Sequence, residues 1–133
     1  MLSTTEQNLL CKALVNLKSI NSLTLPTVAN TAILEVIATN LKLKILDLSC
    51  STNVTDYSLM HLIGNQSLCN DTLQQLFLDG TSVTTNGIMV LLGNLPLEIL
   101  ESPSLERALG NLFKVFVKKF TSENNFKIIL CHY

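Results

Sequence analysis

The chain has no tryptophan, and phenylalanine and tyrosine together supply only 5% of its 133 residues. Charged residues are also scarce, at 14%, and the formal net charge is −1. Nucleic-acid-binding proteins need a basic surface for the phosphates, and those that bind single strands add aromatic rings on which bases stack. We therefore expect no nucleic-acid partner.

Targeting and membrane signals are also missing from the sequence. The first residues, MLSTTEQN, contain no basic segment followed by an apolar run, as a signal peptide would. No run of about 20 apolar residues could form a membrane-spanning helix. We expect a cytoplasmic or nuclear protein without a membrane partner, in which the four cysteines are reduced thiols. The sequons at Asn53, Asn65 and Asn70 are then not expected to be glycosylated.

No pattern for metal binding or catalysis is apparent. The sequence lacks a C-x-x-C pair, and Cys131 and His132 are too close in sequence to be an ordinary pair of zinc ligands. No nucleophile, base and orienting group form a recognisable set. Asp47 and Glu101 have roughly the separation of paired glycosidase carboxylates, but nothing else supports that interpretation. We expect no cofactor, no metal and no enzymatic activity, with the cysteines packed as small hydrophobic residues.

What the chain does have is leucine at a repeated spacing. The stretch from Leu43 to Leu48 has the form L-x-x-L-x-L, and the same frame recurs at intervals of 23, 30, 24 and 29 residues. The five copies are Ile20-Leu23-Leu25, Leu43-Leu46-Leu48, Leu73-Leu76-Leu78, Leu97-Leu100-Ser102 and Phe126-Ile129-Cys131. Self-similarity at such a period is typical of repeat architectures.

Between these frames the spacing of apolar residues becomes helical, and no hairpin signal separates the strands. Parallel strands joined by helical crossovers are therefore predicted. Strands are expected at 20–25, 43–48, 73–78, 97–101 and 126–133, and helices at 4–18, 28–41, 55–64, 85–92 and 103–120. Residues 1–19 form a capping helix or a partial repeat. The repeats then cover 20–42, 43–72, 73–96, 97–125 and, in part, 126–133.

Several residues have expected roles at the helix ends. Thr4 and Gln7 fit a capping box for the first helix, Thr55 is an expected N-cap, and Gly64 is an expected left-handed residue after the helix it follows. Residues 65–72 are expected to be a polar insert. The buried stripe of the first helix is predicted to consist of Leu9, Leu10, Ala13, Leu14 and Leu17.

The second frame continues as Ser49-Cys50-Ser51-Thr52-Asn53-Val54-Thr55-Asp56. This stretch resembles the leucine-rich-repeat family, closest to the cysteine-containing subtype found in F-box/leucine-rich-repeat proteins and their relatives without an F-box. That subtype reads L-x-x-L-x-L-S-G-C-x-x-[IV]-T-D-x-G-L. Here Ser51 occupies the usual cysteine position, and Cys50 stands one place earlier. The resemblance covers residues 20–133 and implies an α/β fold: a short solenoid of about five repeats, with parallel strands on the concave face and helices on the convex face.

The resemblance also implies a function. It suggests a non-catalytic protein–protein interaction module that recognises a substrate or partner, as F-box/leucine-rich-repeat receptors of ubiquitin ligases do. A cullin-adaptor complex would be reached only through a segment missing here, because no F-box precedes the repeats. An inhibitor or scaffold of the ribonuclease-inhibitor kind is an alternative, which the alternating repeat lengths favour. An immune-receptor ectodomain is disfavoured, because a signal sequence and cysteine caps are absent.

Strand alternation indicates where a protein partner would bind. The first, fourth and sixth residues of each frame should enter the core, so the third and fifth should face outward on the concave side. The predicted partner-binding residues are Ile45, Asp47, Gln75, Phe77, Asp79, Ile99, Glu101, Ile128 and Leu130. A contiguous row of solvent-facing apolar residues usually marks an interaction surface. The alternative is that β-branched residues merely suit strands. The last strand, 126–133, has no polar cap, so we also expect self-association through it, or a chain cut from a longer protein.

Overall fold

The computed structural model describes residues 2–101 and 127–129 of the chain. The helices in these residues are α1 (Thr4–Val15), α2 (Thr31–Asn40), α3 (Asp56–Ile63) and α4 (Thr85–Asn94). The strands are β1 (Ser22–Thr24), β2 (Ile45–Asp47), β3 (Gln75–Phe77), β4 (Ile99–Glu101) and β5 (Lys127–Ile129). The helix predicted over 103–120 lies outside the described residues.

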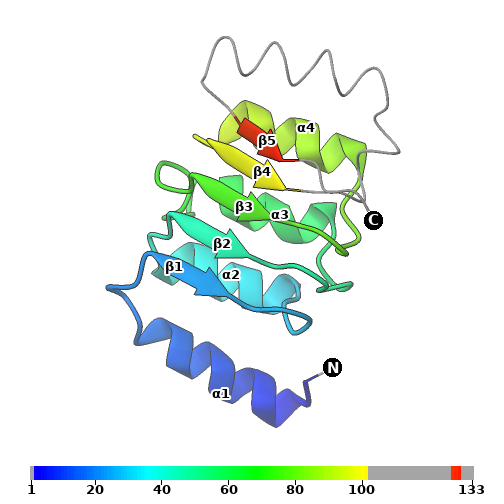
Figure 1. The fold of residues 1–133 in the computed structure, drawn as a ribbon. Helices are drawn as coiled ribbons and strands as arrows, with labels where there is room; N and C mark the ends of the chain where they lie inside the picture. The colour runs from blue at the N-terminus through cyan, green and yellow to red at the C-terminus, as the bar shows by residue number, and fades with distance from the viewer. Residues whose placement is uncertain (1, 102–126, 130–133) are drawn as a thin grey trace.

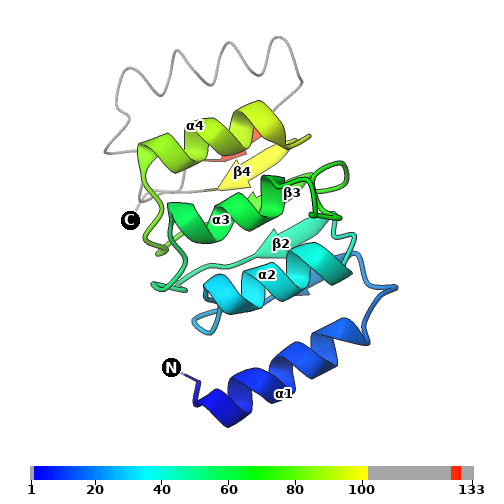
Figure 2. The same ribbon diagram turned by 180° about the vertical axis from the view of Figure 1, so that it is seen from behind.

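The five strands form one parallel sheet, in the order β1-β2-β3-β4-β5. Helices α2, α3 and α4 lie along one face of this sheet, and α1 packs beside α2 at the β1 end (Figures 1 and 2). In the part of the chain that the structure describes, no helix covers the opposite face, which we call the sheet face. The predicted α/β class and the parallel pairing of the strands are confirmed.

Successive strand–helix units share the same backbone details. In β2, β3 and β4 alike, the first N–H of the strand and the N–H before it donate to one carbonyl of the preceding unit. These acceptors are Asn21, Lys44 and Gln74. The structure therefore repeats at the level of single hydrogen bonds.

A second shared detail lies two residues after the apolar residue that ends each frame. There the backbone is left-handed, with φ of 69° at Thr27, 64° at Cys50 and 73° at Gly80. This conformation suits glycine, and other residues adopt it only where the surrounding structure holds them. Its recurrence at one register position shows that the same turn leads out of β1, β2 and β3.

The core lies between the sheet and the helices and combines the leucines of the frames with apolar residues of the helices. The first, fourth and sixth positions of the second and third frames are 0% exposed; they are Leu43, Leu46, Leu48, Leu73, Leu76 and Leu78. The predicted alternation is therefore confirmed in these strands. Burying one such side chain contributes about 1.5–3 kcal/mol, and helix residues such as Ile33, Leu59 and Leu91 are buried to the same extent.

Helix α1 begins one residue earlier than the predicted cap implied. Its N-cap is Ser3, whose Oγ accepts from Glu6 N at 3.1 Å, while Ser3 N donates to Glu6 Oε1 at 3.1 Å. The prediction of Thr4 and Gln7 as the capping box is thus wrong. Ser3 with Glu6 and Thr4 with Gln7 both have the spacing of a capping box. The structure forms the Ser3–Glu6 box, in which the N–H groups of Ser3 and Glu6 both donate to a side chain.

The buried side of α1 is narrower than predicted. Leu14 is buried and Leu10 is partly buried, but Leu9 is 62% exposed and Leu17 is 42% exposed. The helix touches the rest of the described chain along α2. The five apolar residues of the stripe cover a wider arc than one neighbouring helix can bury.

The ends of α3 and α4 also differ from prediction. Gly64 follows α3 with φ −68° and ψ 163°, which is extended backbone that any residue can adopt, so the left-handed assignment is wrong. Helix α4 continues through Gly93 and ends at Asn94. It is two residues longer than expected.

The insert at 65–72 is not a solvated loop. Cys69 is fully buried in the core, and its Sγ donates to the carbonyl of Leu41 at 3.2 Å. Leu68 N donates to the carbonyl of Ala38 at 2.7 Å. The loop therefore folds back onto the preceding unit and closes the space between the ends of α2 and α3.

Candidate partner-binding face

Strand register gathers most of the predicted partner-binding residues into two rows on the sheet face. The first, the Ile45 row, consists of Ser22, Ile45, Gln75, Ile99 and Lys127. The second, the Phe77 row, consists of Thr24, Asp47, Phe77, Glu101 and Ile129. Neighbours in a row lie on adjacent strands, roughly 4.8 Å apart. Six predicted residues thus form one continuous patch over β2, β3 and β4.

The patch is half-buried. Ile45, Phe77 and Ile99 are neither core residues nor fully exposed, and Gln75 interrupts the apolar row between the two isoleucines. The most exposed large hydrophobic side chains are elsewhere, on the helices and the insert; among them are Leu9, Tyr57, Met89 and Leu68. A partner on the sheet face would therefore contact only the exposed parts of these half-buried side chains.

Asp47 has a fixed carboxylate in this patch. Its Oδ1 accepts from Ser49 N at 2.9 Å, a local bond of the kind that aspartate makes at turns. This is the only hydrogen bond of the Asp47 side chain in the described part of the chain, so Oδ2 has no partner there. Asp79 is in neither row and follows β3 directly, where its carbonyl accepts from Cys50 N at 2.6 Å.

The fifth strand is shifted by one residue from the predicted alignment. The frame spacing aligns Ile128 with Ile99 on the sheet face, but Ile128 pairs with Leu100, whereas Lys127 pairs with Ile99. A shift of one residue exchanges the two faces of a strand. The placement of Ile128 in the Ile45 row is therefore wrong, and the row ends on Lys127. The predicted site residue Leu130 lies outside the described residues.

At the usual cysteine position of the repeat, Ser51 joins two units. It is fully buried, and its Oγ accepts from Ala29 N at 3.1 Å and donates to the Leu25 carbonyl at 3.2 Å. A buried backbone N–H that found no acceptor would be destabilising. Ser51 thus completes the turn of the preceding unit.

The three described cysteines differ from one another. Cys69 is buried, and burial raises the pKa of its thiol, so it matches the prediction of a packed structural thiol. Cys11 is half-buried and Cys50 is exposed. The prediction is wrong for Cys50, because its left-handed backbone lies in the turn that leaves β2.

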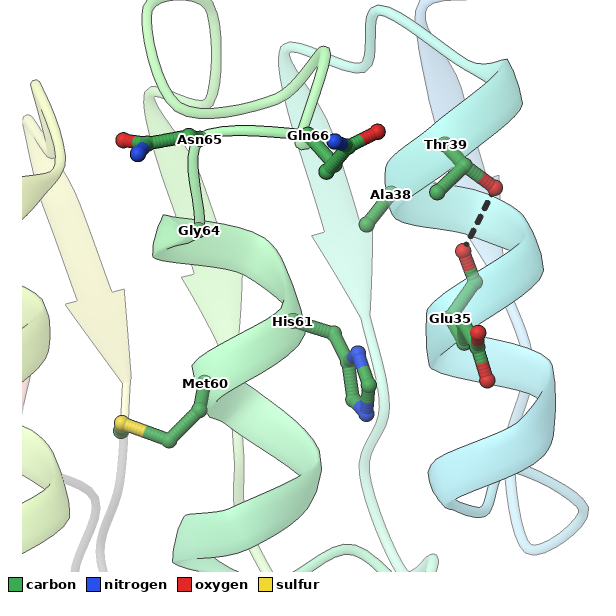
Figure 3. A pocket seen from close by; sticks show the side chains of 8 residues that line it. All are labelled: Glu35, Ala38, Thr39, Met60, His61, Gly64, Asn65 and Gln66. Atoms are coloured by element: carbon green, nitrogen blue, oxygen red, sulfur yellow. Dashed lines mark hydrogen bonds between the residues drawn. The ribbon is translucent and has the colours of Figure 1, made fainter.

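A shallow pocket of about 370 Å³ lies on the other side of the molecule, between α2 and α3. It is lined by Glu35, Ala38, Thr39, Met60, His61, Gly64, Asn65 and Gln66 (Figure 3). The Thr39 hydroxyl donates to the backbone carbonyl of Glu35 at 2.8 Å, and the ring of His61 meets Tyr57 edge to face, with centroids 5.8 Å apart. Sequence reasoning missed this pocket, because the returning insert forms one of its walls.

Within residues 2–101 and 127–129, no three histidine, cysteine, aspartate or glutamate side chains are grouped so that they could hold a metal ion. None of the helices in these ranges is long and apolar enough to cross a membrane. No family model and no curated protein matches the chain.

Proposed function

We propose that this chain is a leucine-rich-repeat solenoid of about five repeats, with its sheet on the concave side, and that it binds a protein partner without catalysing a reaction. The observation that carries the proposal is the sheet face. Ile45 and Ile99 lie in one row and Phe77 in the neighbouring row, on the three adjacent strands β2, β4 and β3, and all three residues are only half-buried. Apolar residues gathered on an open face are typical of a binding surface.

The repeated backbone supports the leucine-rich-repeat class. The left-handed turn recurs at Thr27, Cys50 and Gly80, and Ser51 bonds to the preceding unit from the position where the subtype has cysteine. In repeat proteins each unit buries its core against its neighbours, as the leucine frames do here. These features follow the same motif that carries the resemblance.

Substitutions on the two faces of the molecule test the binding surface. Phe77→Ser and Ile99→Ser remove apolar contacts from the sheet face, and Val90→Ser removes an exposed apolar side chain from α4 on the opposite side. We expect partner capture from a cytosolic extract to be lost in the first two variants and kept in Val90→Ser, with melting temperatures close to wild type. A large fall in melting temperature for Phe77→Ser would instead assign Phe77 to the core.

The kind of partner follows from the resemblance, which points to substrate selection for a ubiquitin ligase in the cytoplasm or nucleus. Affinity purification tests it, because a cullin or its adaptor should then be recovered with the chain. A second candidate is an inhibitor of the ribonuclease-inhibitor kind. In its favour, the residues paired at the middle of each strand are spaced by 23, 30, 24 and 28 residues; they are Leu23, Leu46, Leu76, Leu100 and Ile128. A single stoichiometric enzyme in the eluate would favour that candidate.

A further inference from the structure

The middle of the chain has charge of one sign only. Between residues 45 and 101 there is no lysine and no arginine, although the whole chain is close to neutral. The same stretch has six carboxylates, which are Asp47, Asp56, Asp71, Asp79, Glu98 and Glu101. Strands β2 and β4 of the partner-binding patch therefore each have one acidic residue, and none of β2, β3 and β4 has a basic one.

Two of these carboxylates belong to the Phe77 row. Asp47 is paired with Phe77 on one side, and Glu101 is paired with Phe77 on the other. With strands about 4.8 Å apart, the two acidic residues stand roughly 10 Å from each other with the aromatic residue between them. The carboxylate of Asp47 is held by Ser49 N.

The other carboxylates are placed differently. Asp56 is used inside the fold, where it accepts from Thr84 N at 2.8 Å and from the Thr84 hydroxyl. Asp71 is an exposed residue of the insert, Glu98 is an exposed residue before β4, and Asp79 follows β3 in neither row. Asp47 and Glu101 thus stand out, because register brings them together with an aromatic residue on the open face.

This arrangement has the chemistry that recognises a cation on an apolar stem. The head group of an arginine or lysine is attracted to the face of an aromatic ring within about 6 Å of its centre. Acidic residues at the register positions on both sides of Phe77 would add charge-assisted hydrogen bonds. Ile45 and Ile99 are two residues before Asp47 and Glu101 on the same strands, so they would contact apolar residues next to the cation.

The basic residues near the sheet face lie outside this row. Lys44 comes just before β2 and is exposed, and Lys127 is at the end of the Ile45 row, paired with Ile99. An acidic partner would meet Asp47 and Glu101 directly and be repelled. Charge complementarity therefore selects a basic partner.

We propose that the partner is a protein segment that places an arginine or lysine over Phe77, between Asp47 and Glu101, with apolar neighbours on Ile45 and Ile99. This inference rests on the proposed function, because it assigns a partner chemistry to the same face.

Panning of phage-displayed random twelve-residue peptides against the full chain tests the inference. We expect the bound clones to be enriched in arginine and lysine next to apolar residues. Binding of the selected peptides should fall about tenfold in the isosteric double variant Asp47→Asn/Glu101→Gln, because the ring alone retains only part of the attraction. Phe77→Leu, which keeps an apolar side chain but removes the ring, should lower binding several-fold.

A matched control distinguishes the effect of the two acidic residues of the Phe77 row from the effect of the protein's net charge. Glu35→Gln/Asp71→Asn changes the net charge by the same amount at exposed positions away from the sheet face, and it should leave binding within about twofold of wild type. Equal losses in the two double variants would overturn the inference, since they would show general attraction to a negative protein.

The outcomes also distinguish this inference from the proposed function. Neutral or acidic clones that bind Asp47→Asn/Glu101→Gln as well as wild type, but not Phe77→Ser, would overturn the basic partner and leave the binding face intact. Clones that bind Phe77→Ser as well as wild type, or a panning that recovers no clones, would count against both.

Discussion

Helices α3 and α4 both begin after a threonine in extended backbone, yet the two threonines are used differently. The hydroxyl of Thr55 accepts from Ser58 N at 3.4 Å, and Ser58 Oγ accepts from Thr55 N at 3.1 Å, which closes a capping box within α3. Thr84 makes no side-chain cap. Its N–H and hydroxyl donate to the carboxylate of Asp56, the first residue of α3.

The difference shows how neighbouring units are joined. The start of α3 is satisfied by residues three apart in sequence, whereas the start of α4 depends on a side chain 28 residues earlier. Gly87 leaves room for that side chain, because a Cβ added there would lie 2.2 Å from Asp56 Oδ1. Asp56 thus stabilises two helices, its own through the helix dipole and the next through hydrogen bonds.

Removing the Asp56 side chain should have the largest effect on stability, because it joins the starts of α3 and α4. Asp56→Ala deletes both bonds to Thr84 and the acidic residue in the first turn of α3. We expect it to lower the free energy of unfolding by about 3 kcal/mol, against about 1 kcal/mol for Thr55→Ala. Urea unfolding of both variants measures the two losses. Equal losses would mean that the hydrogen bonds from Thr84 to Asp56 stabilise the protein no more than the local cap of Thr55 does.

Filling the space at Gly87 is the next largest change. In Gly87→Ala the new methyl group displaces the Asp56 carboxylate, and we expect a net loss of about 2 kcal/mol even though alanine favours helices. Gly93→Ala on the same helix is the matched control, since a Cβ there meets nothing within 4 Å; it should stabilise the protein by about 0.5–1 kcal/mol. In an Asp56→Ala background, Gly87→Ala should destabilise much less, because only the 3.1 Å approach of the new Cβ to Val83 Cγ1 remains. An equal loss in both backgrounds would contradict the proposed coupling.

Ser51 extends the comparison to the start of α2, where a side chain of the following unit bonds to Ala29 N, one residue before the N-cap Asn30. Ser51→Ala should lower the free energy of unfolding by about 1.5 kcal/mol, because it leaves a buried N–H without its acceptor. Ser51→Cys, which introduces the residue that the resembling repeat subtype has at this position, should lose less than half as much. Thermal unfolding compares the two variants. A loss of stability in Ser51→Cys as large as that in Ser51→Ala would contradict this prediction.

The end of α3 differs from the ends of its neighbours as well, because the insert returns to the preceding unit there. In a Cys131→Ser variant we expect a thiol reagent to label Cys50 first and Cys69 at least about a hundredfold more slowly. Cys69 is buried, and its raised pKa leaves less thiolate at any given pH. Mass spectrometry gives the rates for each site. Rapid labelling of Cys69 would show that the insert opens independently of the core.

The smallest expected effect concerns the local capping box of α1. Hydrogen bonds from the backbone and side chain of Ser3 lower the pKa of Glu6 from its ordinary value of 4.5. Its stabilising effect is therefore complete above that value and is lost as the pH falls through the lowered folded-state pKa. The difference in helix stability between wild type and Glu6→Gln, followed by circular dichroism, should shrink to zero in acid. A difference that is independent of pH would show that the charge of Glu6 has no role.

Much of the fold was predictable because leucine spacing is a local signal. The hexamer frames located every described strand to within a few residues, and the alternation within them identified Leu46 and Leu76 as core and Ile45 and Phe77 as residues of the opposite face. The Thr55 cap was also predictable, since its partner Ser58 is three residues away.

The fifth strand shows where the pattern becomes ambiguous. Ile128, Ile129 and Leu130 are three consecutive apolar residues, and they fit either of two registers equally well. Pairing with β4 selects the register that places Ile128 beside Leu100. Neither side-chain size nor polarity distinguishes the two alignments in advance.

By itself, the sequence determined the order of strands and helices, the parallel pairing and the leucine core, because each depends on residues a few positions apart. Only the tertiary structure decided that Asp56 caps the next helix, that Ser51 completes the preceding turn, and that the polar insert buries Cys69. Those contacts join residues more than 20 positions apart. They form once stacking of the units has brought the partners within hydrogen-bonding distance, and no local periodicity records them.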